Sequence, residues 1–415
     1  MASQKKPSIL LLIKGAAGEL DWVMPLIFQL SKNHNIFTYF RSKRAYEMVK
    51  STEEIFYFWK KINAGYFIDN IYRNFYWRLL RKFFLFFFNN EKNISFFNRK
   101  IHNINFLKEI FLDKNLNIDF KFIFSEYNYP NGWIDSVLEK RNKSLVIHYP
   151  HSPFISFLKK PFKSRYELKG DILLVSGKGD FNRWSNFIDF RKIYSLGIPR
   201  YDNFWVKSII NLKKNNLLNK KSKFVVTIPY KSFFDLFPNE KIKLEKQFRG
   251  ILETLLDYPN IIIIFKIHPR INGRYFYSLL SEYKKFKDRI IVTNSHLYVL
   301  AKNSNLFICN TNTSTIFDGI YFGVPTIQFS PAFKNIDKKE NVNNFYKKNN
   351  ISIIFNNKNE LKKILNDIML KKSTYKWKLQ QNNFRKFFKT ENSIIKIVNF
   401  LKKKYVNKFK NEINI

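Results

Sequence analysis

Short apolar segments alternate with amphipathic helical patterns along this chain, in two series separated by a polar, basic stretch around residues 213–222. The strands expected in the first series are Ile9–Ile13, Ile36–Phe40, Phe122–Phe124, Ser144–Ile147 and Asp171–Val175, and those in the second are Phe224–Ile228, Ile261–Ile267, Ile290–Thr293, Leu306–Cys309 and Pro325–Ile327. Strands that alternate with helices pair in parallel and are covered by helices on both faces. The sequence therefore predicts an α/β fold of two doubly wound sheets facing across a cleft.

The length supports this division, because 415 residues exceed what one ordinary hydrophobic core accommodates. We expect an N-terminal domain over residues 1–205, a C-terminal domain over 206–375, and basic helices over 376–415 that pack on the body. Inside the first domain, the aromatic and basic stretch Arg44–Lys108 and the segment Trp133–Lys140 are both expected to be helical.

The formal net charge is +41, with 73 Lys and Arg against 32 Asp and Glu. Three interpretations stay open at this stage. The excess can be compositional drift, because Lys, Asn, Ile and Phe are abundant together. It can attract an anionic membrane or a nucleotide phosphate, or it can serve nucleic-acid binding.

The single cysteine, Cys309, excludes an internal disulfide and a cysteine-based metal cluster, as is typical of proteins in a reducing cytoplasm. The apolar run Ile9–Ile13 is too short for a signal peptide, and Phe83–Phe88 is far too short to span a membrane. We therefore expect a cytoplasmic protein whose basic helices can attach peripherally to the inner face of an anionic membrane.

In doubly wound sheets, ligands bind beyond the carboxyl ends of the strands. This rule draws attention to the loops after Ile13, Ile147, Ile267 and Cys309. The loop after Ile267 combines Lys266, His268, Pro269 and Arg270. Lys, His and Arg at the end of one strand can donate hydrogen bonds to a phosphate, and His can protonate a leaving group.

The loop after Cys309 is a run of amide and hydroxyl side chains that ends in Thr313, Ser314 and Thr315 and opens an expected helix. Free N–H groups at a helix start, together with hydroxyl donors, favour an anion. A plain helix cap explains this loop equally well on its own. Because we expect the His-Pro loop at the end of a neighbouring strand, an anion site is the better interpretation.

The loop after Ile147 contains His148 and His151, two of only six histidines in the chain. A histidine at a strand end is a natural general base for deprotonating an acceptor hydroxyl, although a proline-rich turn with structural histidines fits as well. The loop after Ile13 has no complete dinucleotide or phosphate-loop signature. Its Glu19 and Asp21 can face the cleft or simply favour the N-terminus of the following helix, and the second interpretation is preferred.

The order of these motifs resembles the CDP-glycerol glycerophosphotransferase family, enzymes of GT-B fold that act in teichoic-acid and capsule assembly. The matching segments are His151-Ser152, Gly197-Ile198-Pro199-Arg200-Tyr201-Asp202, Pro229-Tyr230-Lys231, Lys266-Ile267-His268-Pro269 and Thr311-Asn312-Thr313-Ser314-Thr315-Ile316-Phe317-Asp318. The resemblance covers residues 145–330 and departs from the family at Asn312, Thr313, Ser152 and Tyr230-Lys231.

This resemblance implies a transferase with two Rossmann-like domains that moves a CDP- or CMP-linked polyol phosphate or sugar onto a cell-surface polysaccharide or a lipid-linked, teichoic-acid-like acceptor. It implies that His268, Thr313 and Ser314 contact the donor phosphates, with Lys266 and Thr315 beside them. Arg270 is added as a phosphate-binding candidate from its position in the loop, outside the family pattern. His151 is then the acceptor-side base and His148 the second choice. Residues 197–202 would mark a hinge region. We expect no metal and no cofactor beyond the nucleotide-activated donor, because neither candidate loop carries an Asp-x-Asp pattern.

Two other functions remain as alternatives. One is an enzyme similar to UDP-N-acetylglucosamine 2-epimerases, or a UDP-sugar glycosyltransferase, with the same two-domain architecture. An epimerase needs acid–base carboxylates in its cleft, and the loops considered above hold few. The other is a polyanion- or nucleic-acid-binding protein, which would show strongly salt-dependent affinity; we expect no specific nucleic-acid partner.

Overall fold

The computed structural model describes residues 6–15, 17–69, 79, 83, 120–126, 144–150, 168, 170–212, 223–230, 241–268, 273–310, 314–329, 350–351, 353–372, 374–388 and 390–413. These residues form two compact units. The first unit comprises described residues from Met1–Phe154, Lys160–Trp205 and Lys389–Ile415, and the second comprises those from Val206–Phe388.

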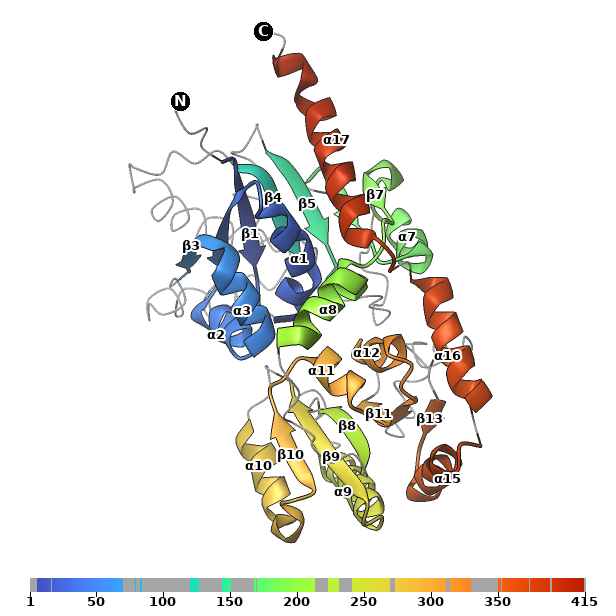
Figure 1. Cartoon of the computed structure of the whole chain (residues 1–415). Helices are drawn as coiled ribbons and strands as arrows, with labels where there is room; N and C mark the ends of the chain where they lie inside the picture. The colour runs from blue at the N-terminus through green and yellow to red at the C-terminus, as the bar shows by residue number, and fades with distance from the viewer. Residues whose placement is uncertain are drawn as a thin grey trace. The chain divides into compact units, whose positions relative to one another are not determined.

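The first unit is built on a parallel sheet of seven described strands in the order β3-β2-β1-β4-β5-β6-β7 (Figure 1). Their bounds are β1 Ser8–Ile13, β2 Asn35–Phe40, β3 Asn63–Ile68, β4 Phe120–Glu126, β5 Leu145–Tyr149, β6 Ile172–Leu174 and β7 Ile193–Tyr194. Every residue of β1 is buried, as expected for a central parallel strand covered on both faces.

The described helices of this unit are α1 Ala17–Leu30, α2 Lys43–Lys50, α3 Glu53–Ile62, α7 Lys178–Ser185 and α17 Ser393–Ile413. Helix α17, from the end of the chain, packs against α1 and the sheet (Figure 1). Its Tyr405 ring lies 5.6 Å from Phe122 on β4, and Lys408 Nζ donates to Asp171 Oδ1 at 2.8 Å.

The second unit holds a parallel sheet of six described strands in the order β10-β9-β8-β11-β12-β13. The strands are β8 Phe224–Tyr230, β9 Ile261–Ile267, β10 Ile290–Thr293, β11 Leu306–Asn310, β12 Thr326–Phe329 and β13 Ile353–Phe355. The described helices are α9 Lys241–Leu256, α10 Gly273–Ser281, α11 Leu297–Lys302, α12 Ile316–Tyr321, α15 Lys358–Met369 and α16 Thr374–Phe387. Helix α8, Asn203–Leu212, crosses the division of the chain between Trp205 and Val206.

The predicted α/β class with two doubly wound sheets is confirmed, and the differences concern short edge strands. The stretch expected to be helical from Arg44 begins with α2 and α3 but continues into strand β3. Strands β7 and β13 were also not expected; with two and three residues they are too short to show a periodic pattern. The expected helix Trp133–Lys140 lies outside the described residues.

The three-part division at residues 205 and 375 stays a prediction. In the structure, α16 belongs to the second unit and α17 to the first. In the described part of the chain, no helix is both long enough and apolar enough to cross a membrane.

The segment expected to form a hinge is a buried connection inside the first unit. Gly197 has φ +112°, which favours glycine, and residues Pro199–Tyr201 form one turn of 3-10 helix. Arg200 makes an ion pair with Asp21 of α1 at 3.2 Å, and both side chains are almost buried, with exposed fractions of 8% and 10%. Asp202 accepts hydrogen bonds from Phe204 N and from Ile394 N at the start of α17.

We predict that Arg200→Met lowers the free energy of unfolding by about 3–5 kcal/mol, because it leaves the Asp21 carboxylate buried without its cation. Urea denaturation followed by circular dichroism measures this change. Arg191→Met is the control, since Arg191 pairs with Asp189 on the exposed surface and its loss should leave the midpoint unchanged. Equal midpoints for Arg200→Met and the wild type would contradict the structural role of the pair.

Candidate functional site

Each sheet has one topological switch point, where consecutive connections leave in opposite directions. In the first sheet it lies between β1 and β4, and in the second between β8 and β11. Ligands of doubly wound sheets bind in the crevice beyond the carboxyl ends of the strands at this point. The residues at these two places are therefore the first candidates for a functional site.

In the second unit, the carboxyl end of β9 carries Lys266 and His268, both half-buried. Lys266 Nζ donates to the carbonyl oxygens of Asn294 and Ser295 at 3.0 and 2.8 Å and so ties the end of β9 to the loop after β10. The His268 backbone N–H donates to Tyr230 O at the end of β8. The structure thus places a cation and an imidazole next to β8, on one side of the switch point.

On the other side of the switch point, Ser314 and Thr315 follow β11 and precede α12. Both are half-buried, and Thr315 Oγ1 lies 3.8 Å from Cys309 Sγ. Helix α12 has only six residues, and the Thr315 side chain makes no capping hydrogen bond. The hydroxyls are therefore the groups of interest here, rather than the dipole of a long helix.

The expectation that the two basic and hydroxyl loops end neighbouring strands is wrong, because β8 lies between β9 and β11. Adjacent strands are about 4.8 Å apart, so the two strand ends are separated by roughly 10 Å. Arg270 and Thr313, which completed the predicted phosphate site, lie outside the described residues.

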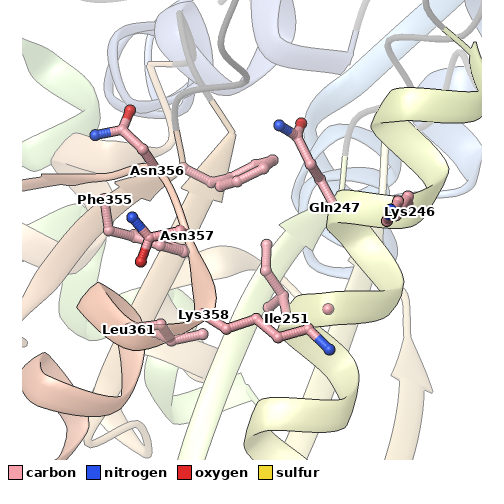
Figure 2. A pocket seen from close by; sticks show the side chains of 10 residues that line it. Lys246, Gln247, Ile251, Phe355, Asn356, Asn357, Lys358 and Leu361 are labelled. Carbon is pink, nitrogen blue, oxygen red and sulfur yellow. The ribbon is translucent and has the colours of Figure 1, made fainter.

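A pocket of about 310 Å³ lies at the same carboxyl edge of the second sheet (Figure 2). The rings of Phe329, the last residue of β12, and Phe355, the last residue of β13, lie 5.4 Å apart in its wall. Helix α9 forms the opposite wall with Gly250 and Ile251, and amide and lysine side chains complete the lining, namely Gln247, Asn356, Asn357, Lys246 and Lys358 (Figure 2). The pocket combines aromatic surface with hydrogen-bonding amides.

In the first unit, His148 belongs to strand β5 itself and not to the loop after it. Its side chain is 4% exposed and packs so closely on Gly170 that a Cβ added there would come within 2.6 Å of Nε2. His151, the first choice as acceptor-side base, lies outside the described residues. The assignment of a catalytic role to either histidine stays a prediction.

The switch point of the first sheet contains a pair of carboxyl groups, Glu19 in the first turn of α1 and Glu126 at the end of β4, with exposed fractions of 1% and 3%. Glu19 accepts hydrogen bonds from the backbone N–H groups of Lys14 at 2.7 Å and Gly15 at 2.9 Å. Burial, the charge of Glu126 and a hydrogen bond between the two carboxyls raise the pKa of Glu19 well above its usual range.

An aromatic residue, Tyr149, lies next to this carboxyl pair. Tyr149, the last residue of β5, is opposite Glu126 in the parallel register, and its ring stacks on Trp22 of α1 at 5.5 Å. Burial and then the charges of Glu19 and Glu126 raise the pKa of Tyr149 well above its usual range. Because successive side chains of a strand point to opposite faces, Tyr149 and His148 lie on opposite faces of the sheet.

Sequence analysis missed Glu126, although a signal was present. The segment Phe120–Glu126 is an apolar strand that ends in a carboxylate, and the strand-end rule points to it as directly as to the other four loops. Glu19 was expected to favour the helix start, and it does lie in the first turn of α1, but its carboxylate binds the preceding loop. Among the described residues, no three His, Cys, Asp or Glu side chains gather as metal ligands.

Two doubly wound parallel sheets in separate units define a GT-B fold, and comparison with solved structures agrees. The S. aureus MnaA–UDP structure has a TM-score of 0.62 at 11% identity, over 97% of each chain. A protein from Listeria monocytogenes has a TM-score of 0.59 at 11% identity, over 91% of each chain. It is assigned as a UDP-N-acetylglucosamine 2-epimerase without proof of that activity.

Two transferases share the fold as well. The wall teichoic acid polymerase TagF, in an H444N form with CDPG, has a TM-score of 0.54 at 11% identity, over 99% of this chain and 90% of that one. The spinosyn rhamnosyltransferase SpnG with thymidine diphosphate has a TM-score of 0.53 at 9% identity, over 95% and 99%. No protein-family model and no curated protein matches the sequence. At these identities the likeness establishes the GT-B fold.

We predict that Cys309 does not react with iodoacetamide in the native protein at pH 8. Burial raises the pKa of its thiol to about 12, and the side chain is completely buried at the end of β11. Mass spectrometry of the alkylated protein, with and without urea, measures the reaction. Modification of the native chain at the rate seen in urea would contradict the packing described for β11 and α12.

Proposed function

We propose that this protein is a GT-B transferase that binds a nucleotide-activated polyol phosphate or sugar in its second unit. It passes the activated group to a hydroxyl of a cell-surface polysaccharide or lipid-linked, teichoic-acid-like acceptor. The observation that carries the proposal is the placement of Lys266, His268, Ser314 and Thr315 at the carboxyl ends of β9 and β11, on both sides of the β8/β11 switch point. The transferred group in this proposal is CDP- or CMP-linked.

The chemistry of these side chains suits a diphosphate. His268 can donate to a phosphate oxygen and stabilise the charge that develops on the departing nucleotide, and Ser314 and Thr315 offer hydroxyl donors. Lys266 already donates to two carbonyl oxygens, so its part in the proposal is to supply positive charge and to hold the loops together. Because the two strand ends are roughly 10 Å apart, they can bind different phosphates of one nucleotide.

The pocket beside β12 and β13 fits the nucleoside part of such a donor (Figure 2). Apolar walls with a few hydrogen-bonding groups are typical of small-molecule sites. A base can lie against the Phe329 and Phe355 side of the pocket while the amides of Gln247 or Asn356 bind its polar edge. Lys246 adds positive charge at the rim.

The acceptor belongs to the first unit in this proposal, where His151 is the base predicted from the sequence. The reaction then requires neither a metal nor a cofactor other than the donor. Peripheral binding to an anionic membrane through exposed lysines of α17, such as Lys402 and Lys403, accompanies the proposal and rests on charge alone.

A thermal-shift screen with CMP, CDP, CDP-glycerol, UDP, UDP-N-acetylglucosamine and ADP tests the proposal. We expect cytidine nucleotides to stabilise the protein by about 2.7 kcal/mol at a hundredfold excess over Kd. His268→Ala should weaken this binding about 10- to 100-fold by removing a charge-assisted hydrogen bond, and Gly250→Leu should weaken it by filling the pocket. Lys287→Ala, an exposed change before β10, is the matched control.

No stabilisation by any of the six nucleotides would refute the proposed function. If Gly250→Leu leaves the stabilisation unchanged, the nucleobase binds outside the pocket beside β12 and β13. The proposed phosphate site would then still be tested by His268→Ala.

The second candidate function is a UDP-N-acetylglucosamine 2-epimerase-like activity. It is favoured by the buried pair Glu19–Glu126, which supplies carboxyl groups that are scarce in the four loops considered from the sequence, and by the fold shared with the epimerase from Listeria monocytogenes. We predict release of CMP or CDP from a cytidine-linked donor and no change in UDP-N-acetylglucosamine incubated alone. Proton NMR of both reactions distinguishes the two functions. Conversion of the UDP-sugar to its C2 epimer would favour the epimerase over the transferase.

A further inference from the structure

The position of the carboxyl pair Glu19–Glu126 in the fold is typical of a ligand site. It lies at the switch point of the first sheet, where doubly wound proteins bind their ligands. Glu126 ends β4, and Glu19 lies in the helix that follows β1, so the two strands on either side of the switch point each contribute to the pair. A hydrogen bond between two carboxyls requires a proton on one of them, and burial together with the like charge of Glu126 raises the pKa of Glu19.

The loop after β1 shows that this switch point is not arranged for a phosphate. In dinucleotide-binding folds, the N–H groups of this loop face the pyrophosphate. Here the N–H groups of Lys14 and Gly15 donate to the two oxygens of the Glu19 carboxyl. An internal carboxyl thus takes the position of the external anion, which leaves this site for a neutral group such as a hydroxyl.

A second observation points to a polar ligand beside the pair. The Tyr149 hydroxyl is completely buried and has no hydrogen-bond partner among the described residues, and the same holds for Trp22 Nε1. Buried polar groups are nearly always hydrogen-bonded, because an unmade bond costs about 1–3 kcal/mol. Tyr149 is opposite Glu126 in the parallel register of β4 and β5, and the charges of both carboxyls raise its pKa further after burial.

We propose that Glu19 and Glu126 form a proton-sharing carboxyl pair that acts as the acid–base group of the first unit and accepts the proton of the acceptor hydroxyl. This inference rests on the proposed transferase function. As the acceptor oxygen forms its bond to the donor, its proton passes to the pair, and the nucleotide leaves with the electrons of the broken bond. The Tyr149 O–H donates a hydrogen bond to the acceptor and so orients it.

The pair suits this task because the shared proton occupies only one of its two carboxyl groups, so the other carboxylate can accept a proton at neutral pH. Burial and the like charge of Glu126 raise the pKa of Glu19, and the Lys14 charge together with its N–H group lowers it again. The titratable groups that set this balance are Glu126 on β4 and Lys14 after β1, and Tyr149 on β5 lies opposite Glu126.

The proton itself can be tested without any substrate. We expect infrared spectra of the full chain in D₂O to show a band of protonated carboxyl well above the pKa of an exposed glutamate, which is about 4.3. The Glu19→Gln/Glu126→Gln double variant should lack this band, and Glu47→Gln, an exposed change on α2, should keep it. If the spectrum at about pH 6 to 7 shows no protonated carboxyl, the inference that the two carboxyls share a proton is wrong.

Stability should follow the same titration. A carboxyl whose pKa is raised by folding adds stability below its unfolded pKa of about 4.3 and loses it as the pH rises through the folded value. We therefore expect the wild-type free energy of unfolding to fall with pH across this window. The decline should be smaller in Glu126→Gln, because the remaining glutamate no longer faces a like charge. An identical decline in both proteins would contradict the coupling of the two carboxyls.

Catalysis is measured as nucleotide release from the donor that the thermal-shift screen identifies. Glu126→Gln should lower kcat about 10²- to 10⁴-fold and remove the acidic limb of its pH profile, while nucleotide binding stays unchanged. Glu47→Gln should be fully active. Unchanged kcat in folded Glu126→Gln, or an intact acidic limb together with loss of activity in His151→Ala, would assign the base to the histidine.

These outcomes separate two failures. If the wild type binds no nucleotide, the transferase function fails, and the infrared result still decides whether the proton is shared. If the wild type binds and releases nucleotide but Glu126→Gln does so equally fast, the function stands and the acid–base role of the pair is wrong.

Discussion

Parallel pairing of strands is the constraint on which this molecule depends. A parallel sheet is covered on both faces, so its central strands are apolar throughout, as in the run Ile261–Phe265 where every side chain is buried. Polar side chains can enter only where the strands stop. Full burial ends before Lys266, Ile267 and His268, which are half-buried. The side chains that could bind a phosphate lie there because the sheet has no other place for polar groups.

The same architecture occurs twice, with opposite chemistry at the two switch points. In the first unit, the carboxyl of Glu19 occupies the N–H groups of the loop after β1, and the surroundings are acidic and aromatic. In the second unit, the strand ends carry Lys266, His268 and hydroxyl groups. In the proposed function, one sheet serves proton exchange and the other binds an anion, which is the division of work that transfer between a donor and an acceptor requires.

The sequence was sufficient for the fold class and for most central strands, because each is a buried apolar run of five to seven residues. It was not sufficient for the order of strands, so the loops after Ile267 and Cys309 were expected on adjacent strands although β8 separates them. Glu126 was missed for a related reason. Its meaning depends on Glu19, more than a hundred residues away in the chain, and no local pattern encodes which carboxyls meet. Donor and acceptor identity depend on contacts that the strand pattern does not specify.

The return of α17 to the first unit sets an order for the folding of the two units. Tyr405 covers Phe122, Lys408 pairs with Asp171, and Ile394 N donates to Asp202. The strands of the second unit lie between these partners in the sequence, so a ribosome makes them before α17 is available. The first unit therefore reaches its final packing only after the second unit has been synthesised.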